Sequence, residues 1–247
     1  AGSGTGGSGG MVVQKLCATK VVPTAPAITD FETYDGTKPA FGTGSWTFTI
    51  GPTAAPAYAG LYALSENTTG ETPPMAYTLG MTGGAMGSNW SARAQNMTTT
   101  DWGGGIGFWM GCVNASAFTG LTFYVRGSAP TGMVNMSLAM EDGTPPDAAN
   151  PAGGGTCDPA PAEGCTGPTF AFPITIDWTP VTIPWAMFAP GRGAGGVALA
   201  ATGDEITGMS FSAGISYVPN PVDGGMPAYV PEPGSFEVAI DNLAFTQ

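Results

Sequence analysis

Groups that could perform acid–base or nucleophilic chemistry are few in this chain of 247 residues, which contains no histidine. Without an imidazole, Ser-His-Asp triads, Cys-His pairs and the usual zinc sites are excluded. The 18 carboxylates remain, and two of them could hydrolyse a glycosidic bond. However, no acidic pair is set apart by its spacing or setting, and no nucleophile accompanies a recognisable base. The sequence therefore predicts a protein that is not an enzyme.

Four cysteines are the second chemically distinctive set. Cys157 and Cys165 bracket a short step in a loop rich in Gly, Pro and Asp, where a local disulfide would pin a long connection. Cys17 and Cys112 would then pair by exclusion. Neither spacing is C-x-x-C, so a metal or redox site is poorly supported, and free thiols are the alternative. Two disulfides would indicate an oxidising compartment.

The charge balance limits the partners. Six basic residues against 18 acidic ones give a net charge of −12, so nucleic acid and anionic membranes are poor partners. Acidic side chains suit a solvated extracellular surface or a Ca²⁺ site. No stretch approaches the roughly 20 apolar residues of a membrane span. The chain begins at Ala1 without an initiator methionine or a signal peptide, as we expect of a secreted protein whose leader has been removed.

The elements that position these groups are predicted to be short strands. The chain has 40 glycines and 23 prolines, and 43% of its residues are hydrophobic, in bursts of strand length. At its centre, Ile106–Met110 and Leu121–Val125 flank a polar turn. The second run alternates: Leu121, Phe123 and Val125 would lie on one face, and Thr122, Tyr124 and Arg126 on the other. We therefore predict a core between two packed sheets.

Similar segments recur along the chain. The further predicted strands are Met11–Cys17, Ile28–Tyr34, Ser45–Ile50, Tyr58–Leu64, Met75–Leu79, Trp90–Met97, Met133–Met140, Phe170–Phe172, Thr179–Ile183, Ile206–Ile215 and Ser235–Phe245. Residues 141–168 form a long acidic loop with the predicted Cys157–Cys165 bridge, and Pro219–Pro233 is predicted to be an irregular loop. No repeat or break in composition argues for two domains. We predict a tail and short strand over residues 1–27 and one β-sandwich domain over 28–247.

Five segments carry a likeness to a known kind of protein. They are Ile28–Glu32, Asp101–Phe108, Asn114–Phe123, Trp178–Pro184 and Ile240–Phe245. In composition and order they resemble motifs of secreted bacterial jelly-roll proteins of the galactose-binding-like, carbohydrate-binding-module type. The resemblance covers about residues 28–247. It implies an all-β jelly-roll β-sandwich of two antiparallel sheets with long loops and little helix. It also implies a non-catalytic extracellular protein that binds polysaccharide or matrix.

The resemblance also implies a structural Ca²⁺. In several such modules an acidic residue of the first-strand motif and the Asp of the last-strand motif join backbone carbonyls around the ion. The matching positions here are Asp30 or Glu32, and Asp241. Oxygen-only ligation suits Ca²⁺ and needs no histidine. The alternative is that Asp30 and Asp241 make hydrogen bonds at turns or strand ends.

Sugar binding would use an exposed aromatic platform flanked by hydrogen-bonding side chains. The candidate aromatic residues are Trp46, Trp90, Trp102, Tyr124 and Trp185, with Arg126, Asn135 and Asp142 as polar neighbours. We expect Tyr124, Arg126 and Asn135 to share the outward face of adjacent strands. For each aromatic residue the alternative is a place in the core.

A second function fits the same sequence: a structural subunit of an extracellular filament, sheath or surface layer. Residues 1–10 are a Gly/Ser tract, followed by a strand candidate. Added to the sheet edge of a neighbouring subunit, such an arm would make the protein its own partner. The predicted assembly residues are Gly10, Met11, Val12, Val13 and Leu16. The sequence does not separate this function from sugar binding.

Overall fold

The computed structural model describes residues 17–29, 61–65, 76–80, 84–88, 91–99, 104–146, 154–158, 164–214, 216–220, 228–232 and 234–247. Within these ranges the chain forms strands and four single-turn 3₁₀ segments, and no α-helix. The 3₁₀ segments are η1 (Ala85–Gly87), η2 (Glu141–Gly143), η3 (Trp185–Met187) and η4 (Ala194–Gly196). The predicted all-β class is confirmed for the described part of the chain.

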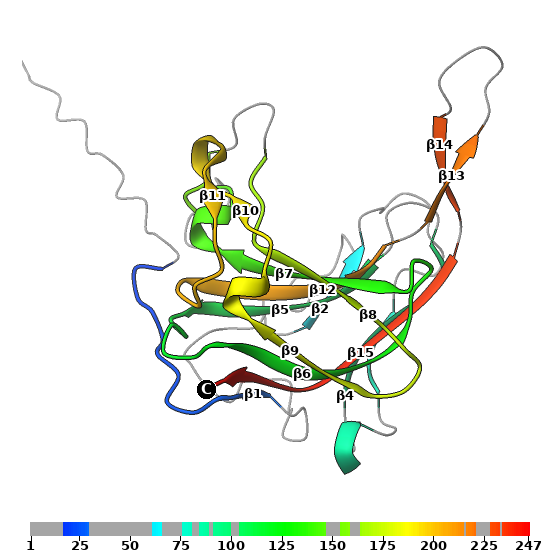
Figure 1. Ribbon diagram of the computed structural model, residues 1–247, viewed down its shortest axis with the longest axis horizontal. Coiled ribbons are helices and arrows are strands. Elements are labelled where there is room, and N and C mark those ends of the chain that lie inside the picture. The colour runs from blue at the N-terminus through cyan, green and yellow to red at the C-terminus, as the bar shows by residue number, and fades with distance from the viewer. Residues whose placement is uncertain are drawn as a thin grey trace, which may run out of the picture.

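Most of the strands belong to two antiparallel sheets that pack face to face (Figure 1). Sheet A runs in the order β2 (Leu61–Ser65), β5 (Gly104–Val113), β12 (Ile206–Ala213), β7 (Met133–Met140) and β8 (Thr169–Pro173). Sheet B runs β3 (Ala76–Gly80), β4 (Ser91–Thr99), β15 (Gly234–Thr246), β6 (Gly120–Ser128) and β9 (Thr179–Pro184), with β1 (Ala27–Thr29) also paired to β15. Two antiparallel sheets that enclose one core confirm the predicted β-sandwich.

The core follows from side-chain alternation on the strands that face each other. Leu121, Phe123 and Val125 of β6 are buried, whereas the intervening residues are partly exposed. Phe211 of sheet A meets Phe123 of sheet B edge to face, with ring centroids 5.0 Å apart. Phe211 also meets Phe108 of β5 at 5.9 Å. Interlocked aromatic rings therefore hold the two layers together.

The first and last described strands lie side by side. Ala27 of β1 is opposite Ala244 of β15. The predicted disulfides are also confirmed: Cys17 is bonded to Cys112, and Cys157 to Cys165. The first bridge fastens the segment before β1 to the end of β5.

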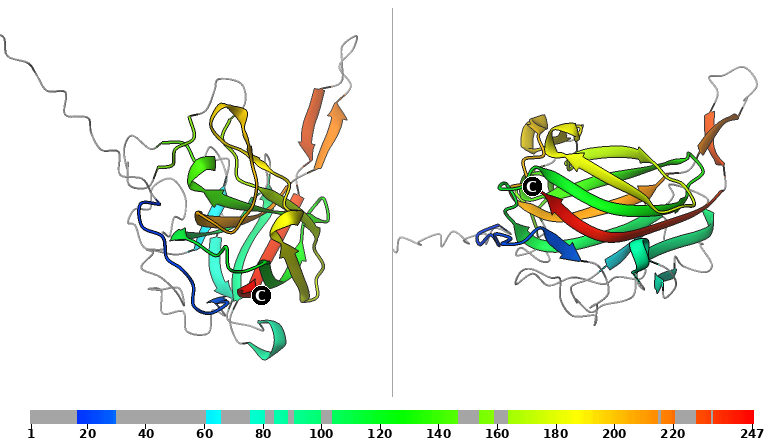
Figure 2. Two further views of the ribbon diagram at one scale, coloured as in Figure 1. Left: turned by 60° about the vertical axis from the view of Figure 1, so that its left-hand side comes forward. Right: turned by 60° about the horizontal axis from the view of Figure 1, so that its bottom comes forward.

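Two hairpins project beyond sheet A at opposite ends of the molecule (Figures 1 and 2). One consists of β10 (Gly191–Arg192) and β11 (Ala198–Leu199), and the other of β13 (Ser216–Asn220) and β14 (Ala228–Glu232). The second hairpin corrects the prediction that Pro219–Pro233 is irregular. This hairpin accommodates Pro219 and Pro231. Each of its strands pairs on one side only among the described strands, and an edge strand tolerates a proline, which has no backbone N–H group.

Candidate functional site

The solvent-facing side of β6 and β9 brings polar and aromatic side chains together. In the register of the two strands Thr122 is opposite Thr182, and Tyr124 is opposite Pro180. Trp178 directly precedes β9, and its ring lies beneath the guanidinium of Arg126, with Cζ 5.0 Å from the ring centroid. We call this set the β6–β9 strip: Thr122, Tyr124, Arg126, Trp178, Pro180 and Thr182.

The local sequence explains why these residues share one face. Side chains two apart on a strand lie on the same side, so Thr122, Tyr124 and Arg126 all face outward while their neighbours enter the core. Strand β9 is the edge of sheet B and pairs with β6 alone among the described strands, so it accommodates Pro180 and Pro184. At roughly 3.3 Å per residue, Thr122 to Arg126 spans roughly 13 Å.

Arg126 has no acidic partner among the described residues. Its Nε is buried and makes no hydrogen bond, and the same holds for Nε of Arg93, whose contact with a carboxylate is an ion pair. The carboxylate of Glu237 on the neighbouring strand β15 lies instead 2.9 Å from Nε of Arg93 on β4. Both arginines are aligned with Ala239, one from each side, so Glu237, two residues away on β15, is diagonal to each of them. The Arg126 guanidinium is held mainly by the Trp178 ring, an interaction within the usual range of cation–π contacts.

This arrangement can bind a ligand that has both apolar and hydroxyl surfaces. The partly exposed rings of Tyr124 and Trp178 offer flat apolar area, and the guanidinium offers several N–H donors in one plane. The hydroxyls of Thr122 and Thr182 lie 3.1 Å apart farther along the strip. The strip contains no carboxylate; its polar groups are the guanidinium of Arg126, the phenol of Tyr124, the indole of Trp178 and the two threonine hydroxyls.

The other predicted sugar-binding residues are not part of the strip. Asn135 lies on β7 in sheet A, so the prediction that it shares a face of adjacent strands with Tyr124 and Arg126 is wrong. Trp185 is 9% exposed and donates its indole N–H to the carbonyl of Phe118, which assigns it to the core and corrects its prediction as a platform. Trp46, Trp90 and Trp102 lie outside the described residues.

Trp178 is the residue that sequence reasoning missed. It begins one of the five resembling segments, but it precedes its strand and belongs to no alternating run. The sequence alone places Arg126 at an outward position of one strand and Trp178 just before another. Their contact depends on β6 and β9 being neighbours, which the sequence pattern does not state.

Asp241 is wholly buried at a bulge in the pairing of β15 with β6. Its Oδ2 accepts the N–H of Ala85 in η1, and its Oδ1 accepts the N–H of Asn242, both at 2.7 Å. The described contacts are therefore those of a strand-end hydrogen-bonding residue. A carboxylate is also the kind of oxygen ligand that Ca²⁺ prefers, so the donor chemistry of Asp241 fits the implied ion. The other implied ligands, Asp30 and Glu32, lie outside the described residues, as do the predicted assembly residues Gly10, Met11, Val12, Val13 and Leu16.

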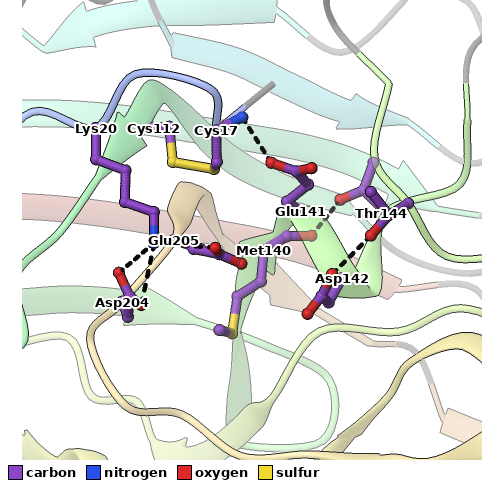
Figure 3. The surroundings of a disulfide bond; sticks show 10 residues. Cys17, Lys20, Cys112, Met140, Glu141, Asp142, Thr144, Asp204 and Glu205 are labelled. Atoms are coloured by element: carbon purple, nitrogen blue, oxygen red, sulfur yellow. Dashed lines mark hydrogen bonds and ion pairs between the residues drawn. A yellow bond between two sulfur atoms is a disulfide. The ribbon is translucent and has the colours of Figure 1, made fainter. Parts of the chain in front are cut away.

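A cluster of charged groups surrounds the Cys17–Cys112 bridge (Figure 3). Buried Glu141 accepts the backbone N–H of Cys17 at 2.6 Å. The ammonium of Lys20 lies 2.9 Å from both Glu205 and Asp204. Its hydrogen bonds to Glu205 first and Asp204 second raise the pKa of Lys20 above its ordinary value. These contacts hold the segment from Cys17 to Lys20 against the sandwich. The described residues contain no group of three or more Cys, Asp or Glu side chains that could hold a metal ion.

No helix in the described ranges is long and apolar enough to cross a membrane. No family model matches the chain, and no curated protein matches its sequence. Several solved structures are similar in fold. A family 11 carbohydrate-binding module from Clostridium thermocellum, in complex with a β-1,3-1,4-mixed-linked tetrasaccharide, is 13% identical with a TM-score of 0.47, over 93% of this chain and 97% of that one.

Two further structures belong to the same range of similarity. A putative sugar binding protein from Bacteroides thetaiotaomicron is 11% identical with a TM-score of 0.42, over 90% of this chain and 99% of the other. The N-terminal cellulose-binding domain of a Cellulomonas fimi β-1,4-glucanase is 13% identical with a TM-score of 0.32, over 76% and 88% of the two chains. These are proteins of the type that the sequence motifs resemble, and at these scores they assign no role to individual residues.

Proposed function

We propose that the protein is a non-catalytic, extracellular polysaccharide-binding β-sandwich that holds its ligand along the β6–β9 strip. One observation carries this proposal: Arg126 stacks on Trp178 at an exposed sheet edge and has no acidic partner in the described structure. The chain has 18 acidic and 6 basic residues, yet none of the described carboxylates pairs with this partly exposed guanidinium, so its outward N–H groups are available to a ligand. A ligand rich in hydroxyls would supply acceptors for these N–H groups.

The shape and charge of the strip support a neutral polymer. It is an elongated surface of roughly 13 Å between its end residues on β6, longer than one sugar ring. Pyranose rings present apolar faces that stack on aromatic side chains, and hydroxyl rims that accept N–H bonds. The net charge of −12 disfavours polysaccharides that carry carboxylate or sulfate groups. The two disulfides support an oxidising, extracellular location.

The test compares Trp178→Ala with a matched control, Ile176→Ala. Ile176 lies in the same connection, is 79% exposed and is absent from the strip. Affinity electrophoresis in gels containing β-glucan, xylan, cellulose derivatives or starch would identify the ligand, and calorimetry would measure the affinity. We expect Trp178→Ala to weaken binding at least about tenfold, equivalent to about 1.4 kcal/mol, and Ile176→Ala to leave it unchanged. Equal affinity of both variants, or no retardation in any gel, would refute the proposal.

We further propose that Asp241, with Asp30 or Glu32, holds a structural Ca²⁺. The support is chemical: Asp241 is a wholly buried carboxylate, and β1 ends at Thr29, which is paired with Leu243 near it. Oxygen ligands of this kind are those that Ca²⁺ prefers. The ion would stabilise the junction of the first and last strands and would take no part in ligand recognition on the strip.

A further inference from the structure

A separate pocket of about 340 Å³ lies on the solvent-facing side of sheet A. It is formed between strands β7, β12 and β8 on one side and a wall of residues 143–144 and 165–167 on the other. Its lining residues are Ser137, Leu138, Ala139, Gly143, Thr144, Cys165, Thr166, Gly167, Thr169, Met209 and Ser210. Since the β6–β9 strip is on the outer side of sheet B, the two features lie on opposite faces of the sandwich.

The floor of the pocket is a row of hydroxyls on three neighbouring strands. Ser210 of β12 is opposite Ser137 of β7, which is in turn opposite Thr169 of β8. Adjacent strands are about 4.8 Å apart, so the hydroxyls repeat at about that interval. None of the three side chains makes a hydrogen bond within the described part of the chain. The row is therefore available to a ligand.

A disulfide and backbone hydrogen bonds hold the described residues of the pocket wall in place. Cys165 of the wall is bonded to Cys157, and the N–H of Cys157 donates to the carbonyl of Thr144, which also lines the pocket. Leu138 of β7 donates its N–H to the carbonyl of Pro168. Gly167 approaches β7 so closely that a Cβ there would lie 1.6 Å from the carbonyl oxygen of Leu138. Any other residue at position 167 would clash with β7, so only glycine lets the wall pack this closely against the floor.

The lining defines the class of ligand by charge and polarity. No Lys, Arg, Asp or Glu lines the pocket, so an ionic ligand would be desolvated there without compensation. Five of the lining residues carry hydroxyls, which both donate and accept hydrogen bonds. The volume is near the lower end of the roughly 300–1,000 Å³ range of ligand pockets. These properties fit a small neutral polyol and not an extended polymer.

We propose that this hydroxyl pocket is a second binding site, which takes a single neutral sugar residue, either free or at the end of a chain. The Ser210–Ser137–Thr169 row hydrogen-bonds the ligand hydroxyls, and the wall contacts one side of the ring. The inference does not rest on binding at the β6–β9 strip. With both sites occupied, the protein would hold glycans on two opposite faces.

The test uses the full chain and saturation-transfer NMR with glucose, galactose, mannose and xylose as probes. The variant Ser137→Ala removes one floor hydroxyl with little change in volume, and Ser210→Phe fills the pocket. The matched controls are Ser212→Ala and Ser212→Phe, because Ser212 is on the same face of β12 but is absent from the lining. We expect at least about fivefold weaker binding of one probe in Ser137→Ala and loss of transfer in Ser210→Phe, with both controls as wild type.

Two results would overturn the proposal: no saturation transfer from the wild-type protein to any of the four sugars, or the same affinity in the pocket variants and the Ser212 controls. The variant Trp178→Ala separates the two sites. It should lose polysaccharide binding on the strip and keep transfer to the monosaccharide. If transfer is lost in Trp178→Ala and kept in Ser210→Phe, the sugar is bound on the strip and the pocket is not a site.

Discussion

Arg93 and Arg126 flank Ala239 from opposite sides of β15, yet only Arg93 has the carboxylate of Glu237 within reach, at 2.9 Å. Arg126 turns to the ring of Trp178 on the other side. The position of one acidic side chain therefore decides which arginine remains available for a ligand. This relationship can be tested without altering any residue of the β6–β9 strip.

Replacing Arg93 should weaken binding on the strip. In Arg93→Gln the carboxylate of Glu237 loses its partner and is free to pair with Arg126, which is diagonal to it across β15 and β6. We expect about three- to tenfold lower affinity for the polysaccharide, measured by calorimetry. The double variant Arg93→Gln/Glu237→Gln should restore the affinity, because no carboxylate then competes. A double variant as weak as the single one would contradict this account.

The aromatic contact between the sheets should dominate stability. Phe211 is fully buried and meets both Phe108 and Phe123, so Phe211→Ala leaves a cavity between the layers. We expect a loss of about 3–5 kcal/mol in the free energy of unfolding, measured by urea titration. Met187→Ala, at a side chain that is 56% exposed, should change it by less than about 0.5 kcal/mol. Similar losses in both variants would show that Phe211 is not a core contact.

The two disulfides should contribute unequally. Cys17 and Cys112 are separated by 95 positions, and Cys157 and Cys165 by 8. The chain-entropy relation gives about 4.7 kcal/mol for a loop near the first size and about 2.5 kcal/mol for one near the second. Replacing the first pair by Ser should therefore lower the denaturant midpoint more than replacing the second pair. The reverse order would mean that chain entropy does not govern these bridges.

Stability should depend on Lys20 at high pH. Hydrogen bonds to Glu205 and Asp204 raise the pKa of Lys20 above the ordinary 10.5, so the folded state binds this proton more tightly than the unfolded state does. The contribution is then complete below about pH 10.5 and is lost as the pH rises through the higher folded pKa. Because the pair is partly exposed, the effect should be at most about 1 kcal/mol. The difference in Tm between wild type and Lys20→Met should shrink above this pH, and a difference that stays constant to pH 12 would contradict the assignment.

Calcium should stabilise the wild-type protein if Asp241 holds the ion. At a Ca²⁺ concentration of about 100 times Kd, the expected gain is about 2.7 kcal/mol, or roughly 5–10 °C in Tm for a chain of this size. Chelation should reverse the gain, and Asp241→Asn should show no response. Asp177→Asn, at an exposed loop position, serves as the control and should respond as wild type does. A Tm that is insensitive to Ca²⁺ would refute the calcium site.

The sequence by itself determined the strand period and therefore which side chains enter the core. The alternation over β6 assigned inner and outer residues correctly, because a strand places successive side chains on opposite sides whatever its neighbours are. The even number of cysteines and their spacing also yielded both disulfides.

Only the tertiary structure decided which strands are neighbours. Tyr124 and Asn135 are close in the sequence and both face outward, yet they lie on opposite sheets because the chain crosses the sandwich between β6 and β7. Arg126 and Trp178 are far apart in the sequence and meet because β6 and β9 pair. Pairing depends on long-range contacts that no local pattern records, and for this reason the strip and the hydroxyl pocket emerged only from the fold.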